Sequence, residues 1–438
     1  MRVLQTLALP LGHGTQLPLQ ICITSDAIGH DPCYLSKTVT VRCTFEGDVS
    51  RLRGWVAAWQ ALAERALEPN PFFEPWFLLP ALRHLPELAS DAGCGLLFIE
   101  EEGGALIGVV PLQLEPLRAL AGRVRLPLMR ARVLTHKYSF CHTPLVDRAA
   151  GARALAALLD WCRARRAPVL ELEDTYADGP VHELLLEEAR RLGSATFVRG
   201  AHERAVFLPR ADASAYLAAA MSPKRRRDLE RRERQLRAAG QLETPELGPG
   251  PGPDAELVPF VDGFLALEAA GWKGAAGTAF ASTAADRGFF VEAVRAGHAE
   301  GRVWFQTVVL DGATIASLLS FVAGASAYSW KICYDERVAK YSPGVYVEVL
   351  NLRRLHARPQ IAWMDSGARP DHPMVNRLWP DRKRIETRWF ATGGVLPATF
   401  VRALPLALRL KTRLTSLRRR PAPRPTTAKP PPDEDNPP

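Results

Sequence analysis

The chain of 438 residues lacks the short motifs that identify several large enzyme classes. It contains no GxxxxGK(S/T) phosphate loop, no HExxH pair and no GxSxG turn, so kinase-type ATP use, zincin chemistry and a serine-hydrolase elbow lose support. The seven cysteines are an odd number with no CxxC pair, which argues against a disulfide framework or a zinc ribbon and indicates a reducing cytoplasm. We expect no signal peptide, and the longest uncharged stretch, 312–330, contains Thr, Ser, Tyr and internal glycines, so two adjacent strands explain it better than a membrane span.

Lysine is also scarce, with 9 Lys against 47 Arg. The formal net charge of +9 is unevenly distributed along the chain. Residues 222–240 hold eight basic and three acidic residues, and 397–438 hold nine basic and three acidic. The rest of the chain is therefore close to neutral. The basicity belongs to two segments and not to the fold, and 223–239 contains no aromatic residues for base stacking, so nucleic acid is not an expected partner.

The order of the expected elements repeats once along the chain. Each half reads as helices, two strands joined by a turn, a third strand, a helix, a strand, a helix and a strand. The turn sequences 102–108 and 311–316 match best, at a spacing of roughly 200 residues. We therefore expect an α/β protein with two tandem lobes, each a mixed, mostly antiparallel sheet flanked by helices. The expected strands are 95–99, 105–114, 132–138, 169–173 and 195–207, then 303–310, 314–322, 327–334, 361–364 and 385–391. The expected helices are about 49–63, 76–84, 152–165 and 180–192, then 223–239, 257–270, 287–299, 343–356 and 373–378.

The expected divisions are an N-terminal extension 1–46 of unclear order, a first lobe 47–208, a second lobe 209–395, and a basic end with a disordered Pro-rich tail, 396–438.

Several motifs of the second half carry a family resemblance. They are Gly271-Trp272-Lys273-Gly274, Asp311-Gly312, Ser329-Trp330-Lys331-Ile332-Cys333-Tyr334-Asp335-Glu336 and Tyr341-Ser342-Pro343-Gly344. With these motifs the chain resembles GNAT-type acyltransferases of the CelD-like group, which is linked to cellulose and polysaccharide biosynthesis and related to the Fem-type aminoacyltransferases. Both families have two tandem GNAT-like lobes, so the resemblance implies that fold, over roughly 50–395.

An acyl-CoA site is expected where the strand that ends at about Tyr334 leads into the helix that begins near Pro343. Unpaired N–H groups and the positive end of a helix bind a pyrophosphate without a dedicated side chain, Gly344 permits close approach, and Lys340 adds a charge. The GNAT pattern R/Q-x-x-G-x-G/A is only partly matched, because the second glycine is missing. An ordinary Ser-Pro-Gly helix start is the alternative. The candidate residues for acyl-CoA, acetyl-CoA or longer, are Lys340, Tyr341, Ser342, Pro343, Gly344 and Val345.

Three residues are candidates for the catalytic chemistry. Asp335 and Asp365 follow neighbouring expected strands, so their carboxylates could converge and accept the proton of an acceptor amine or hydroxyl. A solvated turn for the first and a turn or helix cap for the second are the alternatives. Lys331 is one of few lysines, and arginine cannot replace a lysine where a deprotonatable amine is needed. Direct transfer needs no covalent intermediate.

The acceptor is expected to meet a further set of side chains. An exposed Trp272 and Lys273 would suit a sugar ring or phosphate, and the alternative is a Trp that covers the edge of the core. Lys224 and Arg227 lie in the first turn of the basic helix. The alternative for this helix is a solvated face with internal ion pairs. His142 lies in the matching region of the first lobe, where a structural His is the alternative. No metal site is expected.

The segment 397–420 mixes apolar and basic residues and is typical of an amphipathic helix on an anionic membrane surface. Packing of that helix on the lobes is the alternative. The sequence thus predicts a cytoplasmic acyltransferase, with peripheral contact at the inner face of the membrane, that moves an acyl group to an amine or hydroxyl of a small-molecule or saccharide acceptor. The alternatives are tRNA-dependent aminoacyl transfer to a peptidoglycan-type acceptor and a non-catalytic membrane-surface adaptor.

Overall fold

A computed structural model describes residues 19–23, 39–89, 93–119 and 124–418. The expected tail 421–438 and most of the expected extension lie outside the described residues. The first half contains β1 (Leu19–Ile23), β2 (Val39–Glu46), the 3-10 helix η1 (Arg51–Trp55), α1 (Val56–Glu64), η2 (Pro71–Phe73), α2 (Pro75–His84), α3 (Pro86–Ala89), β3 (Cys94–Glu101), β4 (Leu106–Ala119), β5 (Val124–Val133), β6 (Leu145–Val146), α4 (Gly151–Ala164), β7 (Val169–Tyr176), α5 (Pro180–Arg191) and β8 (Thr196–Phe207). The second half contains α6 (Ala213–Ala220), α7 (Pro223–Ala238), β9 (Leu242–Glu243), β10 (Glu246–Leu247), α8 (Asp254–Ala270), α9 (Trp272–Ala275), η3 (Phe280–Ser282), α10 (Ala284–Ala299), β11 (Val303–Leu310), β12 (Ala313–Ala323), β13 (Ser326–Tyr334), η4 (Glu336–Tyr341), α11 (Pro343–His356), β14 (Trp363–Asp365), α12 (Val375–Leu378), β15 (Asp381–Ala391) and α13 (Val395–Arg418).

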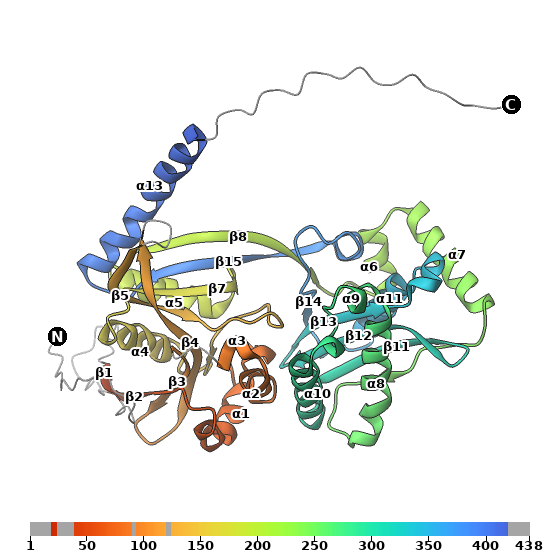
Figure 1. Cartoon of the computed structure of the whole chain (residues 1–438), viewed down its shortest axis with the longest axis horizontal. Helices are drawn as coiled ribbons and strands as arrows, with labels where there is room; N and C mark the ends of the chain where they lie inside the picture. Colours follow the sequence, from red (N-terminus) through yellow and green to blue (C-terminus); the bar gives the residue numbers. More distant parts are fainter. Residues whose placement is uncertain (1–18, 24–38, 90–92, 120–123, 419–438) are drawn as a thin grey trace.

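The two halves repeat one arrangement, which confirms the expected α/β fold with tandem lobes. β3, β4 and β5 form an antiparallel series in the first half, and β11, β12 and β13 do so in the second. Each series then meets a parallel strand, β7 or β14, after a crossover helix, α4 or α11. A parallel neighbour requires such a crossover. Figure 1 shows the two halves side by side, with β8 and β15 running between them.

The last strand of each half is exchanged. β15 pairs with β7 of the first half, and β8 pairs with β14 of the second, so that the strand order through the centre is β7, β15, β8, β14. β8 and β15 also pair with each other, from Asp381↔Val206 to Phe390↔Thr196. One continuous mixed sheet therefore runs through both halves, and no boundary near 208 separates two independent sheets.

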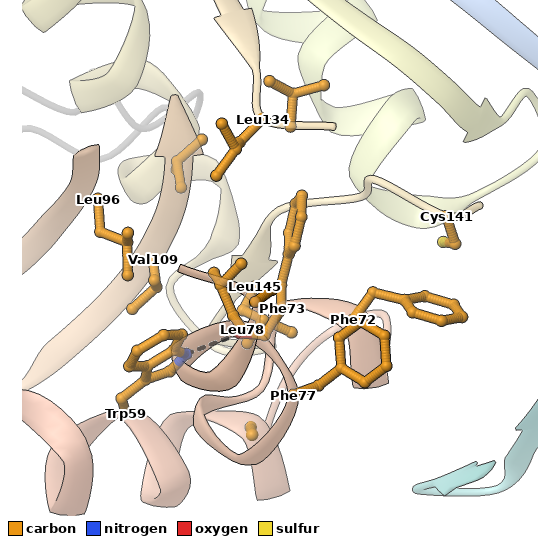
Figure 2. Close-up of a cluster of buried hydrophobic side chains, with 14 of the residues drawn as sticks. Trp59, Phe72, Phe73, Phe77, Leu78, Leu96, Val109, Leu134, Cys141 and Leu145 are labelled. Atoms are coloured by element: carbon orange, nitrogen blue, oxygen red, sulfur yellow. Dashed lines mark hydrogen bonds between the residues drawn. The ribbon is translucent and has the colours of Figure 1, made fainter. Parts of the chain in front are cut away.

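Aromatic side chains join the halves on one side of this sheet. In the first half, the Trp59 Nε1 donates a hydrogen bond of 2.8 Å to the Phe73 carbonyl and fixes the segment that carries Phe72 and Phe77 (Figure 2). The ring centroid of Phe77 lies 5.6 Å from those of Phe321 on β12 and Trp330 on β13. Burial of such large rings is the main favourable term in folding, so this contact fixes the relative position of the halves.

Three local expectations need correction. β2 pairs with β3 from Val41↔Glu101 to Glu46↔Leu96, so the first half begins before 47. The expected strand 132–138 ends at Val133, and the following residues form a loop against the second half. The helix α6 was not expected; Asp212 caps it by accepting a hydrogen bond of 2.7 Å from the Ala215 N–H.

Candidate functional site

β13 and β14 diverge in the second half and leave one edge of β13 without a strand partner in the described chain. Their parallel pairing covers only Ser326↔Trp363 to Tyr328↔Asp365, whereas β13 remains paired with β12 up to Tyr334. The chain turns away after β14 at Gly367, which has φ +59°. A Cβ at this glycine would lie 2.8 Å from the carbonyl oxygen of Ser329, so only glycine permits the turn. Beyond Tyr328 this edge of β13 therefore has no strand partner among the described residues, although the Ile332 carbonyl contacts the Lys273 amine, and an extended molecule can pair there.

A β-bulge in β13 brings Trp330 and Lys331 to the same side of the sheet. Leu319 of β12 pairs with Lys331, but the next residue, Ser320, pairs with Ser329, so Trp330 is the extra residue. The sequence pattern gave no sign of this bulge. It places the Lys331 amine beside the ring of its own neighbour.

The Lys331 amine lies in an aromatic enclosure. Its Nζ is 5.1 Å from the ring centroid of Tyr138, 5.4 Å from that of Phe280 and 5.6 Å from that of Trp330. Within the described part of the chain, no carboxylate pairs with this amine. Burial, together with the nearby charge of Lys273, lowers the pKa of Lys331 to about 8.

Tyr138 reaches this enclosure from the first half of the chain. It lies in the loop after β5, and its backbone carbonyl accepts a hydrogen bond of 2.8 Å from the Trp330 Nε1. Its ring stacks on Phe289 of α10 with centroids 5.1 Å apart, while Lys137 forms an ion pair of 2.6 Å with Asp286. Sequence reasoning missed Tyr138, because its segment was interpreted as a strand. Both halves therefore build the site.

Lys273 supports the site and does not point at an acceptor. Its Nζ donates hydrogen bonds of 2.8 Å to the buried Glu268 carboxylate and 3.1 Å to the Ile332 carbonyl of β13. The other Glu268 oxygen accepts a hydrogen bond of 2.8 Å from the Phe280 N–H. Trp272, in contrast, is 58% exposed on the short helix α9. Lys273 therefore fixes Phe280 and β13 relative to each other.

The start of α11 lies just beyond β13, as expected. The preceding helix η4 ends at Tyr341, Ser342 follows in a left-handed conformation with φ +55° and ψ +55°, and α11 begins with Pro343. Gly344 and Val345 follow, at positions where backbone N–H groups have no partner within a helix. Arg232 of α7 donates hydrogen bonds from Nη1 of 2.6 Å to the Ser342 Oγ and 3.4 Å to the Lys340 carbonyl. The sequence did not single out Arg232.

Two of the expected phosphate-site residues have close neighbours of their own. A Cβ at Gly344 would lie 2.9 Å from the Tyr334 ring, so the absence of a side chain there serves packing on β13. The Lys340 Nζ lies 4.8 Å from the Tyr341 ring centroid, and Lys340 is exposed.

The two candidate aspartates do not converge. Asp365 is fully buried between the halves and accepts hydrogen bonds of 2.6 Å from the Tyr176 hydroxyl and 3.2 Å from the Arg204 Nη1. Asp335 caps η4 and binds Arg337 through both carboxylate oxygens, which lowers the pKa of Asp335. Asp365 aligns with Tyr328, and seven residues of strand at about 3.3 Å each separate that position from Asp335, roughly 20 Å. Neither carboxylate is placed beside Lys331.

The remaining candidates lie apart from the enclosure. Lys224 and Arg227 are exposed in the first turn of α7. His142 is buried, with its Nε2 2.9 Å from the Ser139 Oγ and its Nδ1 3.1 Å from the Glu173 carbonyl, and burial lowers the pKa of His142 to about 4. These contacts fit a structural role. No group of three or more His, Cys, Asp or Glu side chains in the described ranges is arranged to hold a metal ion.

Comparison with known protein families gives a match that covers the second half of the site. Residues 223–372 match the family described as acetyltransferase (GNAT) domain, and this range includes α7, β13, α11 and β14. No curated protein matches the chain.

Among solved structures, the C-terminal domain of a putative lysylphosphatidylglycerol synthetase from Agrobacterium fabrum is similar over 83% of this chain and 96% of that chain, with 13% identity and a TM-score of 0.48. FemX is similar over 76% of this chain and 95% of its own, with 12% identity and a TM-score of 0.49. A tandem GNAT protein from the clavulanic acid biosynthesis pathway is similar over 81% and 99%, with 16% identity and a TM-score of 0.35.

Proposed function

We propose that this protein is an acyltransferase that moves an acyl group from acyl-CoA to an amine or hydroxyl acceptor, with the reaction at Lys331 of the second half. The match of residues 223–372 to an acetyltransferase (GNAT) domain supports the reaction class. The observation that carries the proposal is the edge of β13 that lacks a strand partner in the described ranges, with the Lys331 amine at its bulge, paired to no carboxylate there, and the start of α11 just beyond its end.

The site has groups suited to both ends of a coenzyme A thioester. The extended, amide-bearing arm of coenzyme A can pair with the free edge of β13 as an added strand would. Its pyrophosphate fits the N–H groups of Gly344 and Val345 at the positive end of α11. Arg232 supplies a positive charge beside Ser342 at the same place. The side chain of Lys340 is a second, more exposed charge there.

Lys331 is the group we assign to proton transfer. The acceptor nitrogen or oxygen bonds to the thioester carbonyl carbon, the carbon–sulfur bond breaks, and the thiolate leaves. The proton that the acceptor loses passes to the Lys331 Nζ, which is free to accept it only when neutral. With a pKa of about 8, roughly one Lys331 amine in ten is neutral at pH 7. An unperturbed lysine would be neutral roughly two to three hundred times less often.

For the acceptor we propose a saccharide or another precursor of the cell envelope. Trp272 supports this choice, because its side chain is exposed and it precedes Lys273 in the chain, whose amine contacts the Ile332 carbonyl, one residue from Lys331. An exposed indole offers an apolar face on which a sugar ring can lie.

Calorimetry with acetyl-CoA and longer acyl-CoA esters, combined with the release of free thiol on addition of candidate acceptors, tests the proposal. We expect saturable binding of at least one ester and acceptor-dependent thiol release. Absence of heat with every ester would contradict the proposal, and binding of aminoacyl-tRNA in its place would establish aminoacyl transfer instead.

A further inference from the structure

The helix α13 begins on the sheet of the first half and then leaves it. Its first turns bury Ala398 and Val401 against Val169, Ala195 and Ala391. Figure 1 shows the later turns extending away from the body of the molecule. At about 1.5 Å per residue, a helix of this length reaches some 36 Å. The attachment is therefore rigid at one end, and the rest of the helix is presented outward.

The outward side of α13 carries unusually exposed apolar residues. Val395, Leu396 and Leu406 are 80%, 83% and 63% exposed and are the three most exposed large hydrophobic side chains among the described residues. At 100° per residue they fall, with the exposed Ala403, within a sector of roughly 100°. The buried Val401 lies on the opposite side of the helix. The apolar side is thus not the one that packs on the sheet.

The sequence extends this pattern to the end of the helix. Leu410, Leu414 and Leu417 follow Leu406 at intervals of four, four and three residues, the spacing of one helical face. Residues 395–420 contain seven Arg and Lys and no Asp or Glu. No helix in the described ranges is long and apolar enough to cross a membrane. The combination of an apolar stripe with unbalanced positive charge is typical of helices that lie in the interface of an anionic bilayer.

We propose that α13 is a peripheral anchor that lays Leu396, Leu406 and the apolar residues that follow into an anionic lipid surface. The absence of acidic residues in 395–420 disfavours a second copy of the same helix as the occupant, because the two would repel. The exposed leucines disfavour nucleic acid, which offers few apolar contacts to a helix of this kind. This inference does not depend on the acyltransferase proposal.

Flotation of the full-length protein with vesicles tests the anchor. We expect binding to vesicles of 30% phosphatidylglycerol in phosphatidylcholine, at least tenfold weaker binding to pure phosphatidylcholine, and release as salt rises above about 0.5 M. The double variant Leu396→Glu with Leu406→Glu should lose at least tenfold in partitioning. The matched control is Val258→Glu with Leu208→Glu, which adds two charges at exposed apolar positions outside α13 and should bind like the parent.

A second pair of variants separates position from net charge. Arg409→Glu with Arg413→Glu should abolish flotation, whereas Arg225→Glu with Arg234→Glu makes the same charge change on exposed positions of α7 and should leave it in place. Equal loss in both pairs would overturn the proposal. So would equal binding to neutral vesicles, a preference for RNA over anionic vesicles, or leucine-dependent self-association without lipid binding.

Discussion

Tyr138, from the first half of the chain, holds its ring 5.1 Å from the Lys331 amine of the second half. The ring is fixed on two sides, by stacking on Phe289 and by the hydrogen bond from Trp330 to its carbonyl. The amine consequently sits in surroundings that neither half provides alone. Low polarity around it is the physical reason for its lowered pKa.

Replacement of Lys331 by Met should remove the proton acceptor while keeping an apolar side chain of similar length. We expect acceptor-dependent thiol release to fall about 10²- to 10⁴-fold, the range typical of general bases, with little change in the calorimetric Kd for acyl-CoA. Lys383→Met is the matched control, because the Lys383 amine also lies over two rings, 5.0 Å from Trp363 and 5.5 Å from Tyr176, outside the site. Equal activity in the two variants would remove Lys331 from the mechanism.

The pH dependence of transfer should report the same amine. Only neutral Lys331 accepts a proton, so the rate is expected to rise about tenfold per pH unit below 8 and to level off above it. A steady-state profile of kcat between pH 6 and 9.5 measures this. A profile that is flat across this range, or that falls as pH rises, contradicts a base with a lowered pKa.

Replacement of Tyr138 by Ala should open the enclosure to water. Hydration of the ammonium then raises the pKa of Lys331 toward its ordinary value, so the midpoint of the pH profile should move upward and kcat at pH 7 should fall about tenfold or more. Tyr138→Phe keeps the ring and is expected to keep the midpoint. If both variants lose activity without a shift of the midpoint, Tyr138 is only a packing residue.

Arg232 should contribute to acyl-CoA affinity through its charge beside Ser342. Arg232→Ala is expected to raise the Kd about tenfold, corresponding to about 1.4 kcal/mol, and to flatten its dependence on salt. Arg231→Ala is the control, since Arg231 pairs with the same Asp228 but has no contact with Ser342. Identical Kd values for the two variants, measured by calorimetry, would place the phosphate groups elsewhere.

Asp365 should matter for stability and not for proton transfer. Asp365→Asn leaves the buried Arg204 without its counter-charge and is expected to cost about 3–5 kcal/mol of unfolding free energy, measured by urea denaturation. Tyr176→Phe removes one hydrogen bond to the same carboxylate and should cost about 1–3 kcal/mol. In both variants the pH midpoint of the remaining activity should stay unchanged; a shifted midpoint would return Asp365 to the catalytic chemistry.

Much of the fold followed from local patterns, and the site followed less well. Helical periodicity and turn residues located most elements and the duplication, because these signals depend on neighbours in sequence. The hydrogen-bond donors to Asp365 are 189 and 161 residues away in the sequence. The residues next to Asp365 in the sequence therefore could not distinguish a buried, paired carboxylate from a catalytic one at the end of a strand. The bulge at Trp330 depends on pairing with β12, and Lys273 lies on the short helix α9, beyond the end of the expected helix 257–270, where it pairs with Glu268.

The exchange of β8 and β15 determines when, during synthesis, the first half can complete its sheet. The first half cannot complete its sheet until β15 pairs with Val169–Tyr176, and that strand is translated about 200 residues later. At about 5–20 residues per second, the unfinished edge of β7 waits for roughly 10–40 s on a translating ribosome. Exposed strand edges promote misassociation, so the nascent chain is expected to need chaperone protection during that interval. Because each half needs a strand from the other, neither half is expected to fold when it is expressed alone.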